Sequence, residues 1–306
     1  MTTMQSAVAT NGHAAVTRAS LRRGALPLRR RAMDILSKVL MSISLLVAIV
    51  PLILVIFYVI QKGAGLLSWD FLTEDIVASP RRTGGGMGPA VAGTLLITGI
   101  ASLIAIPLGL LGAIYLNEYG RNNALARFIR VMADVMTGVP SIVMALFIYI
   151  AVVLTMREKT GLAASLALAA LMLPVVLRSS EEMLKLVPDE LRQASAALGS
   201  RRWKTTLSVV LPAAISGITS GVMLAIARAA GETTPIVVCA GIAYGISWDP
   251  MVEQTALPAQ IFVNAALPFA PAVERAWGAA LTLMIIVLVF TIAARVVASR
   301  FAIKNR

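Results

Sequence analysis

Residues 193–212 read QASAALGSRRWKTTLSVVLP, a polar and basic segment between two of the most apolar stretches of the chain. Pro188 and Asp189, just before it, suit the start of a short helix, because proline fits the first helical turn. Gly199 suits the left-handed position that ends such a helix, and Ser200 can cap the next one. The segment therefore predicts a short helix, set at a sharp angle between two long apolar helices.

The composition indicates a membrane protein. Of the 306 residues, 58% are hydrophobic and only 14% are charged. The mean hydropathy of +0.84 lies outside the range of soluble globular domains. The net charge of +12 alone would suit nucleic acid, but the charges fall between apolar runs, which argues against a nucleic-acid partner. The single Cys239 excludes a disulfide framework, and no set of His, Cys and carboxylates has metal-ligand spacing.

Six apolar stretches approach the roughly 20 residues that a helix needs to cross the hydrocarbon core. They are residues 37–60, 90–116, 128–155, 162–183, 207–230 and 276–299. The predicted fold is therefore an all-α polytopic membrane protein. A basic, disordered tail at 1–36, expected to lie against lipid headgroups, precedes the first span at 37–60. An extracytoplasmic segment follows at 61–89. The five-helix core at 90–299 contains a cytoplasmic coupling loop at 185–206, and a short cytoplasmic C-terminus follows at 300–306.

The distribution of basic residues predicts the orientation of the spans. Of the 27 Lys and Arg residues, 20 fall on the side that holds both termini and the 185–206 loop, and 6 fall on the other side. Because cytoplasmic loops carry an excess of Lys and Arg, both termini and this loop are expected to face the cytoplasm.

The order of residues in the 193–212 segment resembles the EAA loop of ABC importer permeases. That loop has the pattern EAA, three residues, Gly, nine residues, then I-x-L-P. The matching positions here are Gln193, Ala194, Ser195, Gly199, Val209, Leu211 and Pro212, with Gln, Ser and Val departing from the pattern. The resemblance implies a helix that docks on a separate ATPase. The alternative is an ordinary basic loop, anchored at the membrane interface by Trp203.

Ionisable residues within a span are functional candidates, because inserting them is costly. Arg178 and Arg228 lie in predicted spans, and Glu232 and Thr233 follow Arg228 within about one turn. We expect these four residues to line a polar route for an anion, because a guanidinium stays charged and its donors match an oxyanion. Two structural alternatives remain open: Arg228 and Glu232 neutralise each other as an i,i+4 pair, or Arg178 snorkels to the cytoplasmic surface. Glu232 is the only intramembrane carboxylate that we expect.

Helix-breaking residues mark candidate gates or hinges in these spans. They are Gly138, Pro140, Pro174, Gly231 and Pro235. The glycine run at 84–88 lacks the following Lys-Ser/Thr of a nucleotide P-loop, so we interpret it as a flexible entry into the second span. No nucleophile–base pair stands out, and the sequence predicts no enzyme active site.

Several stretches together resemble the PstA family of phosphate-importer permeases. They are GGGMGPAVAGTLLIT, GVPSIVMALF, LPVVLRSSEEMLKLVPDELRQASAALG, ARAAGETTP and LPAQIF, within about residues 83–265. The resemblance implies a non-catalytic, multi-pass permease subunit in the bacterial plasma membrane. Its implied partners are a homologous permease, PstC, a dimer of the ATPase PstB and the phosphate-binding protein PstS. ATP and Mg²⁺ would be bound by the ATPase, and this chain would bind no cofactor.

Two other functions fit parts of the pattern. The first is an ABC permease for another oxyanion, such as sulfate, molybdate or phosphonate, since the same loop and cationic route would serve. The second is an ion-coupled secondary transporter, which would need inverted repeats and an ion or proton relay within the spans. The sequence has no obvious repeat, so the second alternative is weaker.

Overall fold

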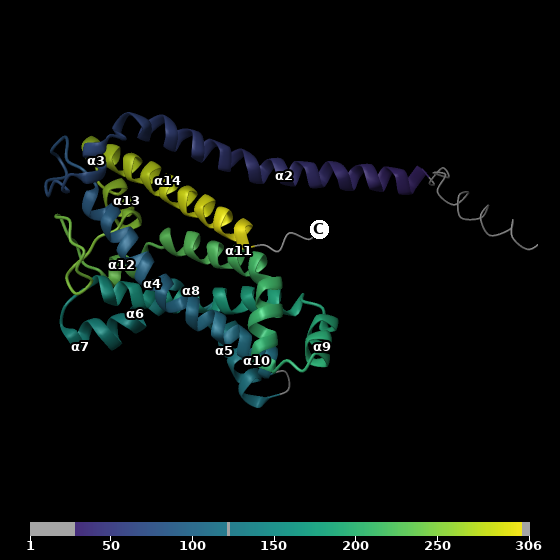
Figure 1. Cartoon of the computed structure of the whole chain (residues 1–306). Helices are drawn as coiled ribbons and strands as arrows, with labels where there is room; N and C mark the ends of the chain where they lie inside the picture. Colours follow the sequence, from purple (N-terminus) through teal and green to yellow (C-terminus); the bar gives the residue numbers. More distant parts are fainter. Residues whose placement is uncertain (1–27, 121–122, 302–306) are drawn as a thin grey trace, which may run out of the picture. The chain divides into compact units, whose positions relative to one another are not determined.

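The computed structural model describes residues 28–120 and 123–301, and every regular element in this part of the chain is helical (Figure 1). The predicted all-α class is therefore confirmed. The chain divides into two units, residues up to Tyr58 and residues from Val59 onward, and each is described by itself.

Helix α2 (Leu28–Gly63) contains the first predicted span but begins at Leu28, not at Ser37. Its first turns are polar, and an ion pair of 2.8 Å joins Asp34 to Lys38 one turn later, which supports helix beyond the apolar stretch. Residues 28–36 are thus helical, whereas the sequence favoured disorder there. Residues 1–27 of the expected tail, and residues 302–306 of the expected C-terminus, lie outside the described residues.

The remaining elements follow in chain order. They are η1 (Ala64–Leu66), α3 (Trp69–Thr73), α4 (Gly88–Ile114), η2 (Tyr115–Tyr119), α5 (Ala124–Gly138), α6 (Ser141–Ile148), η3 (Tyr149–Val153), α7 (Leu154–Met156), α8 (Gly161–Lys185), α9 (Asp189–Ala197), α10 (Arg202–Thr205), η4 (Thr206–Val210), α11 (Leu211–Ala230), α12 (Thr234–Cys239), α13 (Leu257–Ala265) and α14 (Ala270–Phe301). Among the described residues, five helices are long and apolar enough to cross a membrane, or six if one bent pair counts as a span.

The bent pair lies where we predicted a third span at 128–155. The helices on either side of the break, Ala124–Gly138 and Ser141–Met156, meet at 107°. Val139 between them is extended (φ −71°, ψ 126°), because the proline that follows it disfavours the helical conformation. The Gly138–Pro140 signal therefore marks a full break in the helix and not a simple kink.

Helix α8 packs against both α4 and α11 (Figure 1). On α11, Gly217 faces Met183 and Gly221 faces Ser179, so closely that a Cβ atom at either glycine would come within 2.5 Å of the facing side chain. From Gly217 to Gly221 the residue number rises by four on α11, while the facing residue on α8 falls by four, from Met183 to Ser179. The two helices therefore run antiparallel. Glycines four residues apart let the helix backbones approach closely, as in many membrane helix pairs.

The other predicted breaks differ from one another. Helix α11 ends at Ala230, and α12 begins at Thr234 with Pro235 in its first turn, so the interruption predicted around Gly231 is present. In contrast, α8 continues through Pro174 without interruption. The missing backbone N–H of Pro174 removes one helical hydrogen bond but does not interrupt this helix.

The 193–212 segment begins as the sequence predicts. Helix α9 starts at Asp189, and Gly199 adopts a left-handed conformation with φ +76°. The N–H of Gly199 donates to the carbonyl of Ala196, and that of Ser200 donates to the carbonyl of Ser195, which closes the helix. Ser200 does not cap the next helix, however. The N-cap position of α10 is Arg201, one residue later, and no side chain forms a capping hydrogen bond there.

The close contact between α8 and α11 predicts that Gly221→Val destabilises the protein, because the added methyl groups overlap the side chain of Ser179. We expect a loss of about 1–3 kcal/mol in reversible unfolding in mixed micelles. Gly99→Val is the matched control, since Gly99 also lies within an apolar helix but has no atom within 4 Å of a built Cβ. Equal stability of the two variants would contradict this packing.

Candidate functional site

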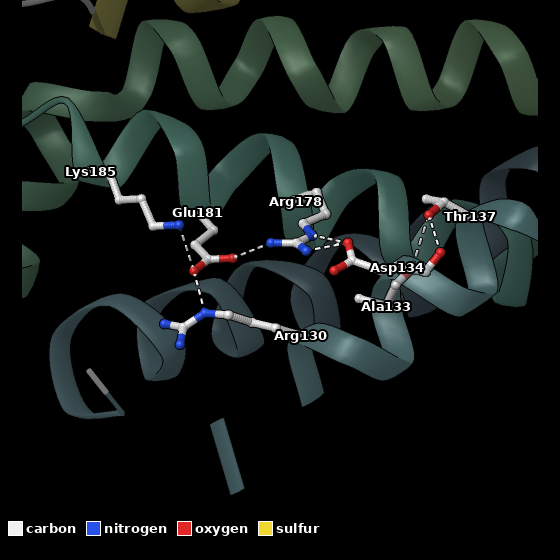
Figure 2. Close-up of polar contacts among 7 residues, drawn as sticks. All are labelled: Arg130, Ala133, Asp134, Thr137, Arg178, Glu181 and Lys185. Carbon is white, nitrogen blue, oxygen red and sulfur yellow. Dashed lines mark hydrogen bonds and ion pairs between the residues drawn. The ribbon is translucent and has the colours of Figure 1, made fainter. Parts of the chain in front are cut away.

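The carboxylate of Glu181, on α8, is the centre of a charged cluster formed by α5 and α8 (Figure 2). The residue is fully buried. Its carboxylate accepts hydrogen bonds from Nε of Arg130 at 2.8 Å and from Nη1 of Arg178 at 3.3 Å. Nζ of Lys185 lies 2.9 Å from the same carboxylate. Three cations thus compensate one buried anion, which would be costly to bury alone.

Arg178 also forms an ion pair with Asp134 on α5, in addition to its contact with Glu181. Its Nε donates to Oδ1 of Asp134 on α5 at 2.8 Å, and its Nη2 donates to the same oxygen (Figure 2). The backbone carbonyl of Leu116 accepts from Nη2 of Arg130 at 2.8 Å. The cluster therefore ties α5 to α8, and Arg178 has protein partners instead of reaching alone for the membrane surface.

Arg228 is held more loosely. Its Nε lies 3.9 Å from Oε1 of Glu232, and its side chain remains 69% exposed. The two residues contribute to a hollow of about 10 Å³ between α8 and α11, which has room for about one water. The predicted i,i+4 pairing is present, but it leaves most donors of this guanidinium free for another partner.

The antiparallel register decides how far apart the two arginines lie along α8. The hollow that contains Arg228 is also lined by Leu171, Met172 and Val175 of α8. Arg178 follows Met172 by six residues, which is about 9 Å along the helix. The two arginines therefore lie at different levels along α8 and do not belong to one cluster. Thr233, half-buried at the N-cap position of α12, follows Glu232 directly.

Arg192 joins the short helix α9 to the ends of two long helices. Its Nη2 donates to Oε1 of Glu118, on η2 at the end of α4, at 3.0 Å, and to the carbonyl of Leu184 at 3.0 Å. Its Nη1 donates to the carbonyl of Val187 at 2.6 Å. The side chains of Arg192 and Glu118 are only 15% and 12% exposed. One guanidinium thus binds the ends of both α4 and α8.

The remaining residues of the EAA-like pattern divide between an exposed and a buried group. Gln193 and Ala194 are exposed, as is Leu198 at 87%. Ser195 is buried, and a hydrogen bond of 2.8 Å joins its hydroxyl to that of Thr205 on α10. This contact holds α9 against α10, so the serine that replaces alanine in the pattern has a structural partner. Leu211 and Pro212 are half-buried at the start of α11.

Sequence reasoning missed six residues of this site, which are Glu118, Arg130, Asp134, Glu181, Lys185 and Arg192. Arg130 and Asp134 were overlooked although both lie within the predicted third span, where a charge is itself a signal. Asp134 also corrects the expectation that Glu232 is the only carboxylate within a span. Arg192 and Glu118 gave no comparable signal, because both belong to polar segments rich in charge.

Comparison with known proteins shows the family. The family described as "Binding-protein-dependent transport system inner membrane component" matches residues 105–303, a range that includes the charged cluster, Arg228 and the EAA-like segment. The chain belongs to this family of permeases. It is therefore a multi-pass membrane protein of a binding-protein-dependent transport system.

Among the permeases of this family, the chain is clearly similar to several that are named as phosphate transport permeases. "Phosphate transport system permease protein PstA 1" of Mycobacterium tuberculosis is 41% identical over 287 residues, which cover 92% of this chain and 93% of that protein. The PstA protein of Yersinia pestis is 40% identical over 268 residues, covering 88% and 90%. The resemblance to PstA permeases is thus confirmed.

Solved structures confirm the ABC-permease fold. The permease matches an inward-facing structure of the MetNI methionine ABC transporter with a TM-score of 0.55 and 18% identity, covering 71% of this chain and 94% of that one. It matches a bacterial ABC transporter involved in import of the polysaccharide alginate with a TM-score of 0.58 and 15% identity, covering 89% and 99%. At such low identities the likeness concerns the fold alone.

The charged cluster predicts that Glu181→Gln destabilises the permease, because three cations would lose the anion that compensates them. We expect a loss of about 2 kcal/mol in reversible unfolding in mixed micelles, a modest value because the cations are partly solvated. Glu182→Gln is the control, since the neighbouring carboxylate has the same chemistry but is exposed. If both variants unfold alike, Glu181 does not hold the cluster together.

Proposed function

We propose that this permease is the PstA-type subunit of an ATP-driven importer of inorganic phosphate. The observation that carries the proposal is the guanidinium of Arg228, which lies at the end of a broken helix and keeps most of its donors free. The relatives named as phosphate transport permeases, which match along nearly the whole chain, point to phosphate as the anion.

The proposed route of the anion passes Arg228 and then Arg178. A phosphate oxygen would accept from the Arg228 guanidinium in place of the long contact to Glu232, with the hydroxyl of Thr233 close by. Because the interruption between α11 and α12 leaves backbone groups outside helical hydrogen bonds, it suits the wall of a polar passage. Arg178 would act next, about 9 Å further along α8, by exchanging its bond to Asp134 for the anion.

The energy for transport would come from another chain. We propose that the exposed side of α9, with Gln193, Ala194 and Leu198, docks in a groove of a PstB-type ATPase, which binds ATP and Mg²⁺. This permease would bind no cofactor and catalyse no reaction. Docking from the cytoplasm requires both termini on that side, as the distribution of basic residues predicts.

The other partners follow from the same architecture. A PstC-type permease would form the second half of the passage, and a PstS-type binding protein would deliver phosphate from outside. The hinge function of Gly138, Pro140, Gly231 and Pro235 remains part of this proposal: the two breaks they mark would let α6 and α12 move relative to α5 and α11.

A permease for sulfate, molybdate or phosphonate would use the same fold and the same arginines. Guanidinium groups bind each of these oxyanions, so the geometry alone does not separate them. An ion-coupled secondary transporter is less well supported, because the family is defined by dependence on a binding protein.

ATP-dependent uptake tests the proposal directly. Vesicles that contain this permease with its companion permease, ATPase and binding protein should accumulate phosphate only with ATP, and neither sulfate nor molybdate should compete. Arg228→Gln should reduce uptake at least about tenfold, because it removes a charge-assisted hydrogen bond, while the complex still assembles. Uptake of another oxyanion, or wild-type uptake by the variant, would refute the substrate or the role of Arg228, respectively.

The contacts of Arg192 predict a defect in coupling and not in docking. Arg192→Gln frees α9 from the ends of α4 and α8 but leaves its exposed side intact. We expect the ATPase to copurify normally, while the phosphate transported per ATP hydrolysed falls about tenfold. Arg201→Gln removes the same charge from the neighbouring exposed loop and should transport normally. Loss of the ATPase from the Arg192 variant would show a role in docking instead.

A further inference from the structure

A second cavity, lined mainly by apolar side chains, shares no residue with the hollow beside Arg228. It has a volume of about 240 Å³ and lies between the 76–80 segment, the loop after α12, helix α13 and the start of α14. This volume has room for a tetrahedral oxyanion with part of its hydration shell. The LPAQIF stretch at 257–262 lies along it through Ala259 and Gln260.

Arg275 brings a buried positive charge to the wall of this cavity. The residue is only 4% exposed. Its Nη1 donates to the carbonyl of Arg82 at 2.7 Å, and its Nη2 donates to that of Pro80 at 3.3 Å. Within the described part of the chain, no carboxylate forms an ion pair with Arg275. The carbonyls hold the guanidinium in place, and the neighbouring Glu274 attracts its charge without forming an ion pair.

Lys159 adds a second cation to the wall. It is half-buried, and among the described residues it too has no ion-pair partner. The hydroxyl of Thr255 accepts from Nε2 of Gln260 at 2.9 Å, so its own proton is available to an anion in the cavity. Tyr244 also belongs to the lining.

The described lining contains no Asp or Glu, although carboxylates lie nearby. Glu253 lies against Gly241, which is a lining residue, but its carboxylate does not line the cavity. Among the described residues, the wall therefore combines two cations with apolar and neutral polar side chains, and no carboxylate lines it. Such a wall attracts anions and repels cations.

We propose that this cavity is a binding site for a small oxyanion, inorganic phosphate in the first place, separate from the Arg178 and Arg228 positions. This inference rests on the proposed function for the identity of the anion. In the predicted orientation the cavity opens toward the extracytoplasmic side, where it would receive phosphate before the anion reaches Arg228. Lys159 and Arg275 supply the charge, and Thr255 and Tyr244 supply hydrogen bonds.

Charge-selective labelling of a cysteine in the assembled transporter tests this site without requiring transport. The only native cysteine, Cys239, is buried, so an introduced cysteine reports alone within this chain. Ile242→Cys places the thiol in the cavity wall at an exposed position, and Met251→Cys places it on an exposed loop outside. The rates of reaction with an anionic and a cationic methanethiosulfonate are compared. We expect the anionic-to-cationic ratio to be about tenfold higher in the cavity than on the loop.

Three further variants and one ligand identify the source of this selectivity. Lys159→Gln in the Ile242→Cys background should lower the ratio to that of the loop, while Lys159→Arg should preserve it. Lys62→Gln removes an exposed lysine outside the cavity and should change nothing. Millimolar inorganic phosphate should slow labelling in the cavity only. Equal ratios at the two cysteines, or a ratio unaffected by Lys159→Gln, would overturn the proposed site.

The two proposals fail in distinguishable ways. If vesicles import phosphate but the cavity shows no anion selectivity, the proposed site is overturned while the importer stands. If sulfate slows labelling and phosphate does not, the cavity binds an oxyanion but phosphate is overturned as its occupant, and uptake of sulfate would then replace the proposed function.

Discussion

A charge inside an apolar helical bundle must be compensated, and this constraint shapes the permease around α8. The buried carboxylate of Glu181 is held by Arg130, Arg178 and Lys185, which brings α5 to the side of α8. Asp134 in turn binds Arg178. The Glu181 carboxylate, which is fully buried, would be costly without these cations. Together these charged side chains form a set with one excess positive charge, so the cluster both fastens two helices and leaves a field that favours an anion.

The same physical requirement is met differently at Arg192. Here the guanidinium donates hydrogen bonds to backbone carbonyls at the end of α8 and to the carboxylate of Glu118 at the end of α4. One side chain of the short helix α9 thus contacts the ends of both long helices. Cations are stabilised at helix C-termini by the free carbonyls and the helix dipole. Arg192 thus joins α9 to the ends of α4 and α8, while the Ser195–Thr205 hydrogen bond joins α9 to the start of the helix that continues into α11.

Close backbone contact complements these polar contacts. Gly217 and Gly221 let α11 approach α8 without side chains between them, and this approach sets the register that places Arg228 about 9 Å from Arg178 along α8. The interruption after Ala230 then ends α11 beside Arg228. The spacing of the two arginines along α8 therefore depends on the close packing at glycines that carry no charge.

The sequence alone determined the all-α class, most helix locations, the short helix that begins at Asp189 and is closed by Gly199, and the interruption near Gly231. These features depend on apolar length, on proline and on a left-handed glycine, and each acts within a few residues. The sequence also identified Arg178 and Arg228, because a charge in a span is rare. Only the tertiary structure decided their surroundings. The partners Asp134 and Arg178 are 44 residues apart, and Glu118 and Arg192 are 74 apart. Any of many charged residues could satisfy an arginine, so the choice depends on which helices meet and in what register, and local patterns do not contain that information.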